Sequence, residues 1–317
     1  MTASTAGRIE GAALAAGLVT VTLWGSAFVG IRAAGREFSP GALALGRLVV
    51  SCAVLGAVAL GRREPLPARR DLLAIAAYGV LWLGVYSTTL NAAERRVDAG
   101  TAAMLVNTGP ILIAVLAGFV LHEGFPRGLF AGLAVAFGGC VLIGLATVRT
   151  GRSEALGVAL CVVAVLAYAA AVVVQKPVLA RVSPFQVTWL GCAVAAVGCL
   201  PFAPALAGDV SSAGAHEIGW VVYLGLFPTA IGFAAWTFAL RRTSAGRMGS
   251  VTYLIPIVAI VFGWLLLGEA PGWLAAAGGP AAARARTVGA RVLRSLPPTA
   301  REGPRLSGFP GRLPDEG

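Results

Sequence analysis

One arginine stands inside an otherwise apolar run of the chain. Arg47 follows PGALALG and precedes LVVSCAVLGAVALG. At the centre of a membrane helix an arginine costs about 2.5–3.5 kcal/mol on insertion scales, so such residues usually face protein or a wet cavity. Arg47 also lies about two turns from Pro40, so its side chain could instead reach back to the outer interface. The two interpretations are binding or packing inside the protein, and anchoring at the interface.

Two acidic residues follow long apolar runs. Glu123 stands in HEGFP and Glu269 in GEAP. Acids within membranes often relay protons, which makes both residues candidates for proton coupling. Their position next to loop residues supports a second interpretation, in which each is a boundary residue bonded to neighbouring backbone or arginine. Glu94, beside Arg95, is expected to be a solvated loop charge.

Two prolines interrupt apolar runs at matching places. Pro110 stands in NTGPILIA and Pro256 in TYLIPIVA. Each removes a backbone hydrogen bond in mid-helix and leaves a carbonyl oxygen available. Interruptions of this kind occur at binding sites or hinges of membrane carriers, and a plain structural kink is the alternative. The symmetric placement favours the functional interpretation.

Other chemistry finds little support in the sequence. The only histidines are His122 and His216, and there is no HExxH, GxSxG or CxxC motif. The five cysteines lie in apolar runs, where they behave as small hydrophobes. No metal, cofactor or disulfide is therefore expected. A membrane-embedded enzyme is the less favoured function, because it would need facing nucleophiles or acids at membrane depth.

The composition places these residues in a membrane protein. Of 317 residues, 57% are hydrophobic and 12% are charged, and the mean hydropathy is +0.82. A soluble protein carries about 25% charged residues, and apolar stretches of about 20 residues can cross a bilayer as helices. The net charge of +11 comes mostly from arginines in short loops, where they orient helices rather than bind nucleic acid. An all-α integral membrane fold is predicted.

Nine apolar runs are long enough to be expected as spans. They lie near residues 11–31, 40–60, 72–90, 99–121, 128–148, 155–175, 184–206, 218–240 and 246–267. At the tenth position only the segment from Gly272 to Ala283 is apolar, which is too short to span. Residues 280–317 are rich in Arg and Pro without periodicity and are expected to form a disordered tail. The tenth helix is therefore missing or altered.

The second half of the chain repeats the first. An offset of 146 aligns Pro110 with Pro256, Glu123 with Glu269, and Arg95-Arg96 with Arg241-Arg242, and an offset of 144 aligns Ser39-Pro40 with Ser183-Pro184. The first repeat covers residues 11–148 with five helices, and the second covers 155–279 with four helices and a partial fifth. Because five is odd, the two copies must have opposite orientations in the bilayer. The fold class is thus a bundle of about ten helices built from two inverted five-helix repeats.

The loop charges agree with this inversion. The loop at 61–71 has four arginines, whereas its counterpart at 207–217 has no Arg or Lys. With the N-terminus inside, the inner loops hold Arg8, Arg62, Arg63, Arg69, Arg70, Arg127, Lys176, Arg181, Arg241, Arg242 and Arg247, and the outer loops hold Arg32, Arg36, Arg95, Arg96, Arg149 and Arg152. Inner loops carry the excess of basic residues in membrane proteins. A cytoplasmic N-terminus is predicted.

Two pairs of aromatic or polar residues coincide between the repeats. Trp24 aligns with Tyr168 under the offset of 144, and Asn107 aligns with Tyr253 under the offset of 146. Tryptophan and tyrosine near span ends are usually interfacial anchors. Their matched positions instead favour these four residues, together with Arg47 and the two prolines, as the lining of a substrate path.

The motifs together resemble the EamA-type members of the drug/metabolite transporter superfamily. They are LWGSAFVGIR at 23–32, SPGALALGRL at 39–48, HEGFP at 122–126 and GEAP at 268–271. The resemblance covers residues 11–279 and implies ten helices, two cytoplasmic termini and a central cavity enclosed by the first four helices of each repeat. The chain departs from that family at the tenth helix, and a frameshift or a natural truncation would explain the departure.

The inverted repeat and the resemblance predict a secondary transporter. It would move a small metabolite, amino acid or drug-like molecule across the bacterial cytoplasmic membrane by alternating access, in the direction of export. A non-functional or truncated transporter product is the alternative. The expected partners are a small-molecule substrate and the lipid bilayer, and proton coupling and a homodimer both stay open. No nucleotide-binding motif is present, so ATP is not expected to drive transport.

Overall fold

A computed structural model describes residues 3–122, 124 and 152–268 of the chain. The predicted span at 128–148, the tenth position, the tail at 280–317, and both Glu123 and Glu269 lie outside these residues. The described elements are α1 (Ala3–Ala34), α2 (Pro40–Arg62), α3 (Arg69–Tyr78), η1 (Gly79–Tyr86), α4 (Ser87–Glu94), α5 (Ala99–Val106), α6 (Gly109–Val120), α8 (Arg152–Val178), α9 (Pro184–Gly198), η2 (Leu200–Phe202), α10 (Ala203–Ser212), α11 (Ala215–Leu224), η3 (Gly225–Ile231), α12 (Gly232–Arg242), α13 (Ala245–Val251), η4 (Thr252–Leu254), α14 (Ile255–Phe262) and η5 (Gly263–Leu267).

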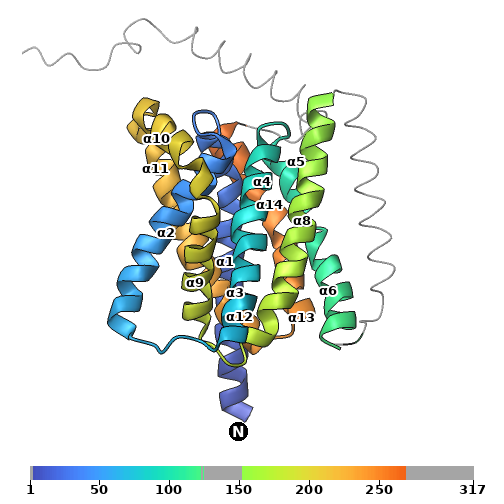
Figure 1. The fold of residues 1–317 in the computed structure, drawn as a ribbon. Helices are drawn as coiled ribbons and strands as arrows, with labels where there is room; N and C mark the ends of the chain where they lie inside the picture. The colour runs from blue at the N-terminus through green and yellow to red at the C-terminus, as the bar shows by residue number, and fades with distance from the viewer. Residues whose placement is uncertain (1–2, 123, 125–151, 269–317) are drawn as a thin grey trace, which may run out of the picture. The chain divides into compact units, whose positions relative to one another are not determined.

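All regular structure in this part of the chain is helical, and the helices run up and down in one bundle (Figure 1). Six helical segments are long and apolar enough to cross a membrane, and α9 with η2–α10 forms a seventh that is bent by 54°. A shorter apolar helix covers Thr252–Leu267. These eight segments correspond to the eight predicted spans that fall within the described residues. The prediction of an all-α membrane bundle is confirmed.

The outside of the bundle is apolar. Large hydrophobic side chains are exposed on separate helices, among them Leu14, Val49, Phe119, Ile257 and Trp264. In water such a surface would be a liability, whereas in a bilayer it faces lipid tails at no cost. The bundle therefore has the surface of a membrane protein as well as the helix lengths.

The third span of each half changes its winding at the same place. The α-helix gives way to wider π-helical turns at η1 in the first half and at η3 in the second, which start at Gly79 and Gly225. These glycines are 146 residues apart. Each lies against backbone of a neighbouring helix, since an added Cβ would be 2.5 Å from the Gly191 carbonyl oxygen at Gly79 and 2.8 Å from the Arg47 carbonyl oxygen at Gly225. Wider turns are frequent at functional sites.

Matched hydrogen bonds connect the two halves at opposite ends of the bundle. At the end where α1 finishes, the amide and the hydroxyl of Ser39 both donate to the Asp209 carboxylate, at 2.8 and 3.0 Å. At the other end the Ser183 hydroxyl donates to the Glu64 carboxylate. Ser39 and Ser183 each stand directly before the second span of their own half. Their partners, Asp209 and Glu64, each lie at the end of the second span of the opposite half. We call these contacts the two end clasps.

The same correspondence recurs within each half. Asn91 donates to the carbonyl oxygen of Pro40 at 3.0 Å, and Thr237, 146 positions later, donates to that of Pro184 at 3.3 Å. Arg32 donates to the carbonyl oxygens of Glu94 and Val97, and Lys176 to those of Leu240 and Thr243. A basic side chain near helix-end carbonyl groups is electrostatically favourable. Equivalent residues thus make equivalent bonds in both halves.

An ion pair joins α3 to the segment after α8 at the end of the bundle that holds Glu64. The Arg181 guanidinium donates two hydrogen bonds to one Asp71 oxygen, and the Asp71 side chain is only 5% exposed. This bond raises the pKa of Arg181 above its ordinary value, so the pair stays charged at physiological pH.

Candidate functional site

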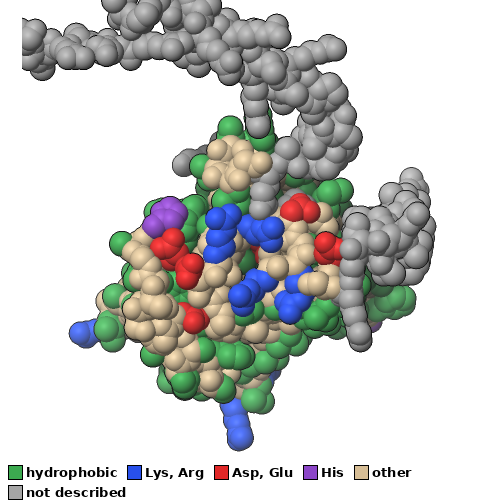
Figure 2. Space-filling view, turned by 90° about the horizontal axis from the view of Figure 1, so that it is seen from above, with side chains coloured by type: hydrophobic (Ala, Val, Ile, Leu, Met, Phe, Trp, Pro, Cys, Tyr) green, Lys and Arg blue, Asp and Glu red, His purple; other side chains and the backbone are tan. Residues whose placement is uncertain are grey.

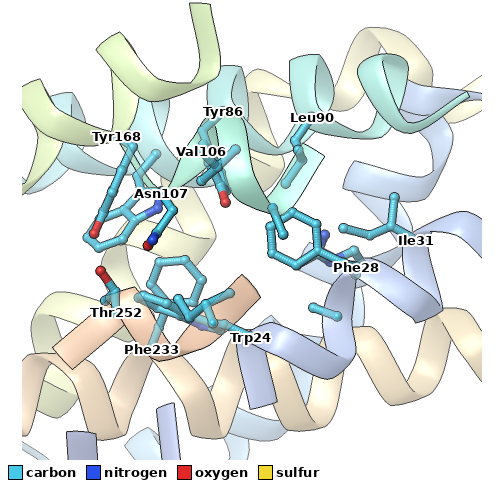
Figure 3. Close-up of a pocket in the computed structure, with 15 residues that line it drawn as sticks. Trp24, Phe28, Ile31, Tyr86, Leu90, Val106, Asn107, Tyr168, Phe233 and Thr252 are labelled. Atoms are coloured by element: carbon cyan, nitrogen blue, oxygen red, sulfur yellow. The ribbon is translucent and has the colours of Figure 1, made fainter. Parts of the chain in front are cut away.

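A cavity lies in the centre of the bundle and takes its walls from both halves of the chain (Figure 3). It encloses about 570 Å³ of empty space, counting the open space at its mouth. The lining residues are Trp24, Ala27, Phe28, Ile31, Arg47, Trp82, Tyr86, Leu90, Ala103, Val106, Asn107, Tyr168, Phe233, Thr252 and Ile255. An apolar pocket with a few polar groups is the usual form of a small-molecule site.

The lining residues from the first half of the chain lie toward one end of the bundle. They come from the last part of α1, the first part of α2, the end of the third span and the end of α5, near the start of the fourth span. Because the spans alternate in direction, these four parts lie at the same end, opposite the N-terminus. The cavity therefore extends toward the end that carries the Ser39–Asp209 clasp.

Arg47 is the single charged side chain among the lining residues. It is 7% exposed, and its Nε and Nη2 atoms donate to the Thr229 hydroxyl oxygen at 3.4 and 3.2 Å. The Thr229 hydroxyl in turn donates to the Leu224 carbonyl oxygen at 2.7 Å, inside the wide turns of η3. One turn further along α2, the Ser51 hydroxyl also bonds to η3, because it donates to the Gly225 carbonyl oxygen at 2.8 Å. The guanidinium is thus fixed within the protein rather than at the interface.

Glu94 lies close to this arginine and is not the solvated loop charge that was expected. It is 1% exposed and near enough to Arg47 and Tyr86 to interact with them electrostatically. The expectation was wrong because sequence alone does not show that the end of α4 is covered by neighbouring helices. A buried carboxylate close to a buried guanidinium lowers the free-energy cost of burying the arginine. Glu94 itself is not among the lining residues.

Aromatic rings close the inner end of the cavity. Trp82 lies at the centre of this group, with ring centroids 5.5 Å from Trp24, 5.0 Å from Phe233, 4.7 Å from Tyr168 and 5.5 Å from Trp236. The Trp24 indole nitrogen donates to the Pro228 carbonyl oxygen at 3.2 Å. Tilted and edge-on ring pairs at these distances attract each other beyond simple burial. We call these five rings the aromatic floor.

Neutral polar groups gather on one side of the cavity. Figure 3 shows Tyr168, Asn107 and Thr252 close together there, opposite Phe28, Ile31 and Leu90. The two helix breaks supply this arrangement. Asn107 directly follows α5, and Thr252 begins η4. Pro110 and Pro256 stand in the first turn of the helices that come next, α6 and α14, where a proline costs no helical hydrogen bond. The prediction that the prolines interrupt a continuous helix was therefore wrong.

Comparison with known proteins supplies the family. The model of the EamA-like transporter family matches twice, at residues 11–145 and 155–283. The chain belongs to this family. Among its relatives, a "Probable terminal-alkyne amino-acid exporter" of Streptantibioticus cattleyicolor is 35% identical over 83% of this chain and 88% of that protein. The "Uncharacterized transporter YdfC" of Bacillus subtilis is 30% identical over 82% of this chain and 84% of that protein.

A solved structure supports the fold. A protein of known crystal structure superposes with a TM-score of 0.58 over 83% of this chain and 91% of its own, at 20% sequence identity. The family match and the relatives, rather than this structure, identify the chain as a multi-pass membrane transporter and not an enzyme, with a small-molecule substrate and the membrane as its partners.

The structure brings four of the predicted path residues together in this EamA family member. Trp24, Arg47, Asn107 and Tyr168 all line the cavity. Arg47 and Tyr168 approach it from different halves of the chain. The repeat pattern that singled out Trp24 and Tyr168 thus places both at one cavity.

The other three predicted path residues lie elsewhere. Tyr253 is 43% exposed and absent from the cavity lining, although its neighbour Thr252 lines it. Pro110 is buried against Gly249 of the other half, where an added Cβ would lie 3.4 Å from the proline. Pro256 is partly buried and also outside the lining. The prolines shape the breaks, and the residues one turn earlier form the wall.

Several lining residues were not chosen from the sequence. They are Phe28, Ile31, Trp82, Tyr86, Leu90, Phe233 and Thr252 among others. Trp82 and Tyr86 stand within η1, whose changed winding alters which residues share a face, so helical periodicity cannot find them. Phe28 and Ile31 follow Trp24 at spacings of four and seven, which is the spacing of one helix face. That signal could have found them.

The end of the bundle toward which the cavity extends carries basic side chains. Figure 2, seen from that end, shows Lys and Arg side chains near the middle of the face, with Asp and Glu to either side. Arg36 and Arg95 are exposed in the segments that leave α1 and α4. Glu37 and Asp98, exposed in the same two segments, offset this positive charge.

Proposed function

We propose that this chain exports a small amphiphilic carboxylate, of the kind represented by an amino acid with an apolar side chain. The observation that carries the proposal is Arg47, a fixed guanidinium in a cavity whose other walls are aromatic, aliphatic and neutral polar groups. A guanidinium binds a carboxylate through charge-assisted hydrogen bonds. The aromatic floor would contact the apolar part of the molecule, and the Asn107 side would bind its remaining polar groups.

The relatives support the same class of substrate. The relative from Streptantibioticus cattleyicolor is named a probable amino-acid exporter and is 35% identical to this chain over 271 residues. We infer export on this basis, across the bacterial cytoplasmic membrane and with the N-terminus in the cytoplasm. The excess of arginine in loops on the N-terminal side supports that orientation.

Alternating access is the proposed mechanism. The matched clasps, the matched η1 and η3 turns and the double match of the family model support two repeats of opposite orientation. Two such repeats can exchange conformations, so that the cavity opens first at one end and then at the other. The cavity described above would then be open toward the outside, with the aromatic floor closing the path to the cytoplasm.

The test is efflux from cells that overproduce the full chain. Cells are loaded with radiolabelled phenylalanine or leucine, or with the corresponding amino-acid amides, and retention is followed over time. Wild-type protein should speed the loss of the carboxylates and not of the amides. Arg47→Ala should slow carboxylate efflux by about 10- to 100-fold, the equivalent of about 1.5–3 kcal/mol for a hydrogen bond to a charged group.

The matched control is Arg69→Ala, which removes an exposed arginine at the opposite end of the bundle. It should transport at the wild-type rate. Equal efflux of carboxylates and amides by the wild-type protein would refute the carboxylate anchor. No efflux of any member of the panel, with the protein folded in the membrane, would favour the alternative of a transport-defective product.

A further inference from the structure

We infer that Gln175, Tyr78 and Trp236, the last a ring of the aromatic floor, form a second, latent polar site on the N-terminal side of that floor, which binds the ligand's hydrogen-bonding group when the bundle opens toward the N-terminal side. The inference rests on the proposed alternating access and adds a site to it. It assigns these residues to the inner part of the substrate path, where the described cavity does not reach.

The first observation is a group of buried polar atoms with few hydrogen bonds. Gln175, Trp236 and Tyr78 are each 0% exposed. Within the described residues, the indole nitrogen of Trp236 has no hydrogen-bond partner, and the Gln175 amide and the Tyr78 hydroxyl have none apart from each other. A buried polar group that lacks a partner in a native structure calls for an explanation, such as a functional role.

The second observation is that these groups adjoin one another around the floor. The Tyr78 and Trp236 rings both contact Trp82, at 5.9 and 5.5 Å between centroids. The Tyr78 hydroxyl lies beside the Gln175 side chain. Gln175 stands three residues before the end of α8, so the cluster lies on the N-terminal side of the floor. Trp82 and the other cavity-lining rings of the floor therefore lie between the cavity and these polar groups.

The third observation comes from the repeat. Gln175 is the equivalent of Ile31 under the offset of 144, and Trp236 is the equivalent of Leu90 under the offset of 146. Ile31 and Leu90 line the outer part of the cavity. Ile31 stands near the end of α1, the repeat equivalent of α8, and Leu90 stands in α4, the repeat equivalent of α12. When the two repeats exchange conformations, Gln175 and Trp236 take the places that Ile31 and Leu90 hold now. These two positions are apolar in the outer half of the bundle, as Ile31 and Leu90, and carry hydrogen-bonding groups in the inner half, as Gln175 and Trp236.

The chemistry of the latent site differs from that of the cavity. It offers an amide, an indole N–H and a phenol hydroxyl, all neutral, in place of a guanidinium. These groups hold a carboxylate more weakly than an arginine does, because they carry no positive charge and cannot form the bidentate pair that a guanidinium forms with a carboxylate. A ligand arriving from the N-terminal side would be held first by neutral groups and then pass to Arg47.

The experiment measures which end of the bundle exposes each position. Gln175→Cys is made in a full-length variant whose five native cysteines are replaced by alanine. Ile31→Cys in the same background is its repeat-related control. Each is combined with a pair of cysteines that locks one clasp through a short bifunctional thiol reagent: Ser39→Cys with Asp209→Cys, or Ser183→Cys with Glu64→Cys. The remaining thiol is then titrated with a membrane-impermeant methanethiosulfonate reagent, which needs no knowledge of the substrate.

Gln175→Cys should react at least tenfold faster when the Ser39–Asp209 end is locked than when the Ser183–Glu64 end is locked. Ile31→Cys should show the reverse. If Ile31→Cys responds to the locks and Gln175→Cys stays unreactive with both, alternating access stands and the latent site is refuted. If neither position responds, alternating access fails and the inference fails with it.

A second variant keeps the inference testable should the cysteine-free protein not fold. Gln175→Leu in the otherwise natural chain replaces the buried amide with an apolar side chain of similar size, like the equivalent Ile31. It should raise the melting temperature in detergent and slow transport at least tenfold. A residue with only a packing role would not couple higher stability to slower transport, so unchanged transport in the stabilised variant would overturn the assignment.

Discussion

At the scale of single residues, Arg47 depends on a neighbour that comes from the other half of the chain. Thr229 accepts hydrogen bonds from two guanidinium nitrogens and is itself tied to backbone in η3. A buried arginine without such a partner would be free to take another rotamer or to pair with Glu94. Thr229 is therefore a positioning residue for the proposed carboxylate anchor.

Thr229→Val removes the hydroxyl and keeps nearly the same shape. We expect the half-saturating substrate concentration to rise by about tenfold, because a hydrogen bond to a charged group contributes about 1.5–3 kcal/mol, while the maximal rate falls much less. Transport kinetics over a range of substrate concentrations measure both quantities. Thr229→Ser retains the hydroxyl and should restore the wild-type value, and a Ser variant as impaired as the Val variant would contradict the positioning role.

At the scale of elements, helices of the two halves approach each other's backbone at two glycines. Gly79 and Gly225 open the π-helical turns and lie against backbone of α9 and α2. A side chain added at either glycine would clash with this backbone, because backbone atoms cannot rotate away as a side chain can. The position of η1, and with it of Trp82 and Tyr86 at the cavity, follows from this close approach.

Gly79→Ala should therefore destabilise the protein. The new Cβ would lie 2.5 Å from the Gly191 carbonyl oxygen, and overpacking of this kind typically costs about 1–3 kcal/mol. The midpoint of unfolding in detergent measures the effect. Gly219→Ala is the matched control in α11, where an added Cβ meets nothing within 4 Å; the control should be neutral or slightly stabilising. A Gly79 variant as stable as the control would show that the helices can move apart freely.

At the scale of the whole molecule, opposite orientation of the two repeats makes a prediction about sidedness. Leu66 follows the second span of the first half, and Ser212 stands 146 positions later, at the end of α10. Both residues are exposed. If the repeats are inverted, these equivalent positions face opposite sides of the membrane.

Single cysteines at these positions test the orientation. In intact cells, an impermeant thiol reagent should label Ser212→Cys and should label Leu66→Cys only after the membrane is permeabilised. The positive-inside distribution of arginine sets this direction. Labelling of both positions from the same side would refute the inverted repeat, and labelling of Leu66→Cys alone in intact cells would refute the cytoplasmic N-terminus.

The cavity shows how far sequence can predict a site in this molecule. Arg47 was identifiable because a charge within an apolar run is costly and therefore rare, and Trp24 with Tyr168 because the repeat aligned them. Tyr253 was selected by the same alignment and is exposed, since the second half continues from Thr252 through η4 where the first half makes a turn at Asn107. A repeat conserves the positions of helices more strictly than the direction of each side chain.

The sequence by itself determined the membrane class, the spans and the duplication, because each depends on composition, length and periodicity along the chain. The tertiary structure decided what lies next to what. It set Thr229 beside Arg47, covered Glu94, and gathered Trp24, Trp82, Phe233, Tyr168 and Trp236 into one floor. These contacts join residues far apart in the chain and depend on π-helical turns and on glycine contacts between helices. Hydropathy and helical periodicity carry no information about such contacts, so Arg47 could be found from the sequence but its partners could not.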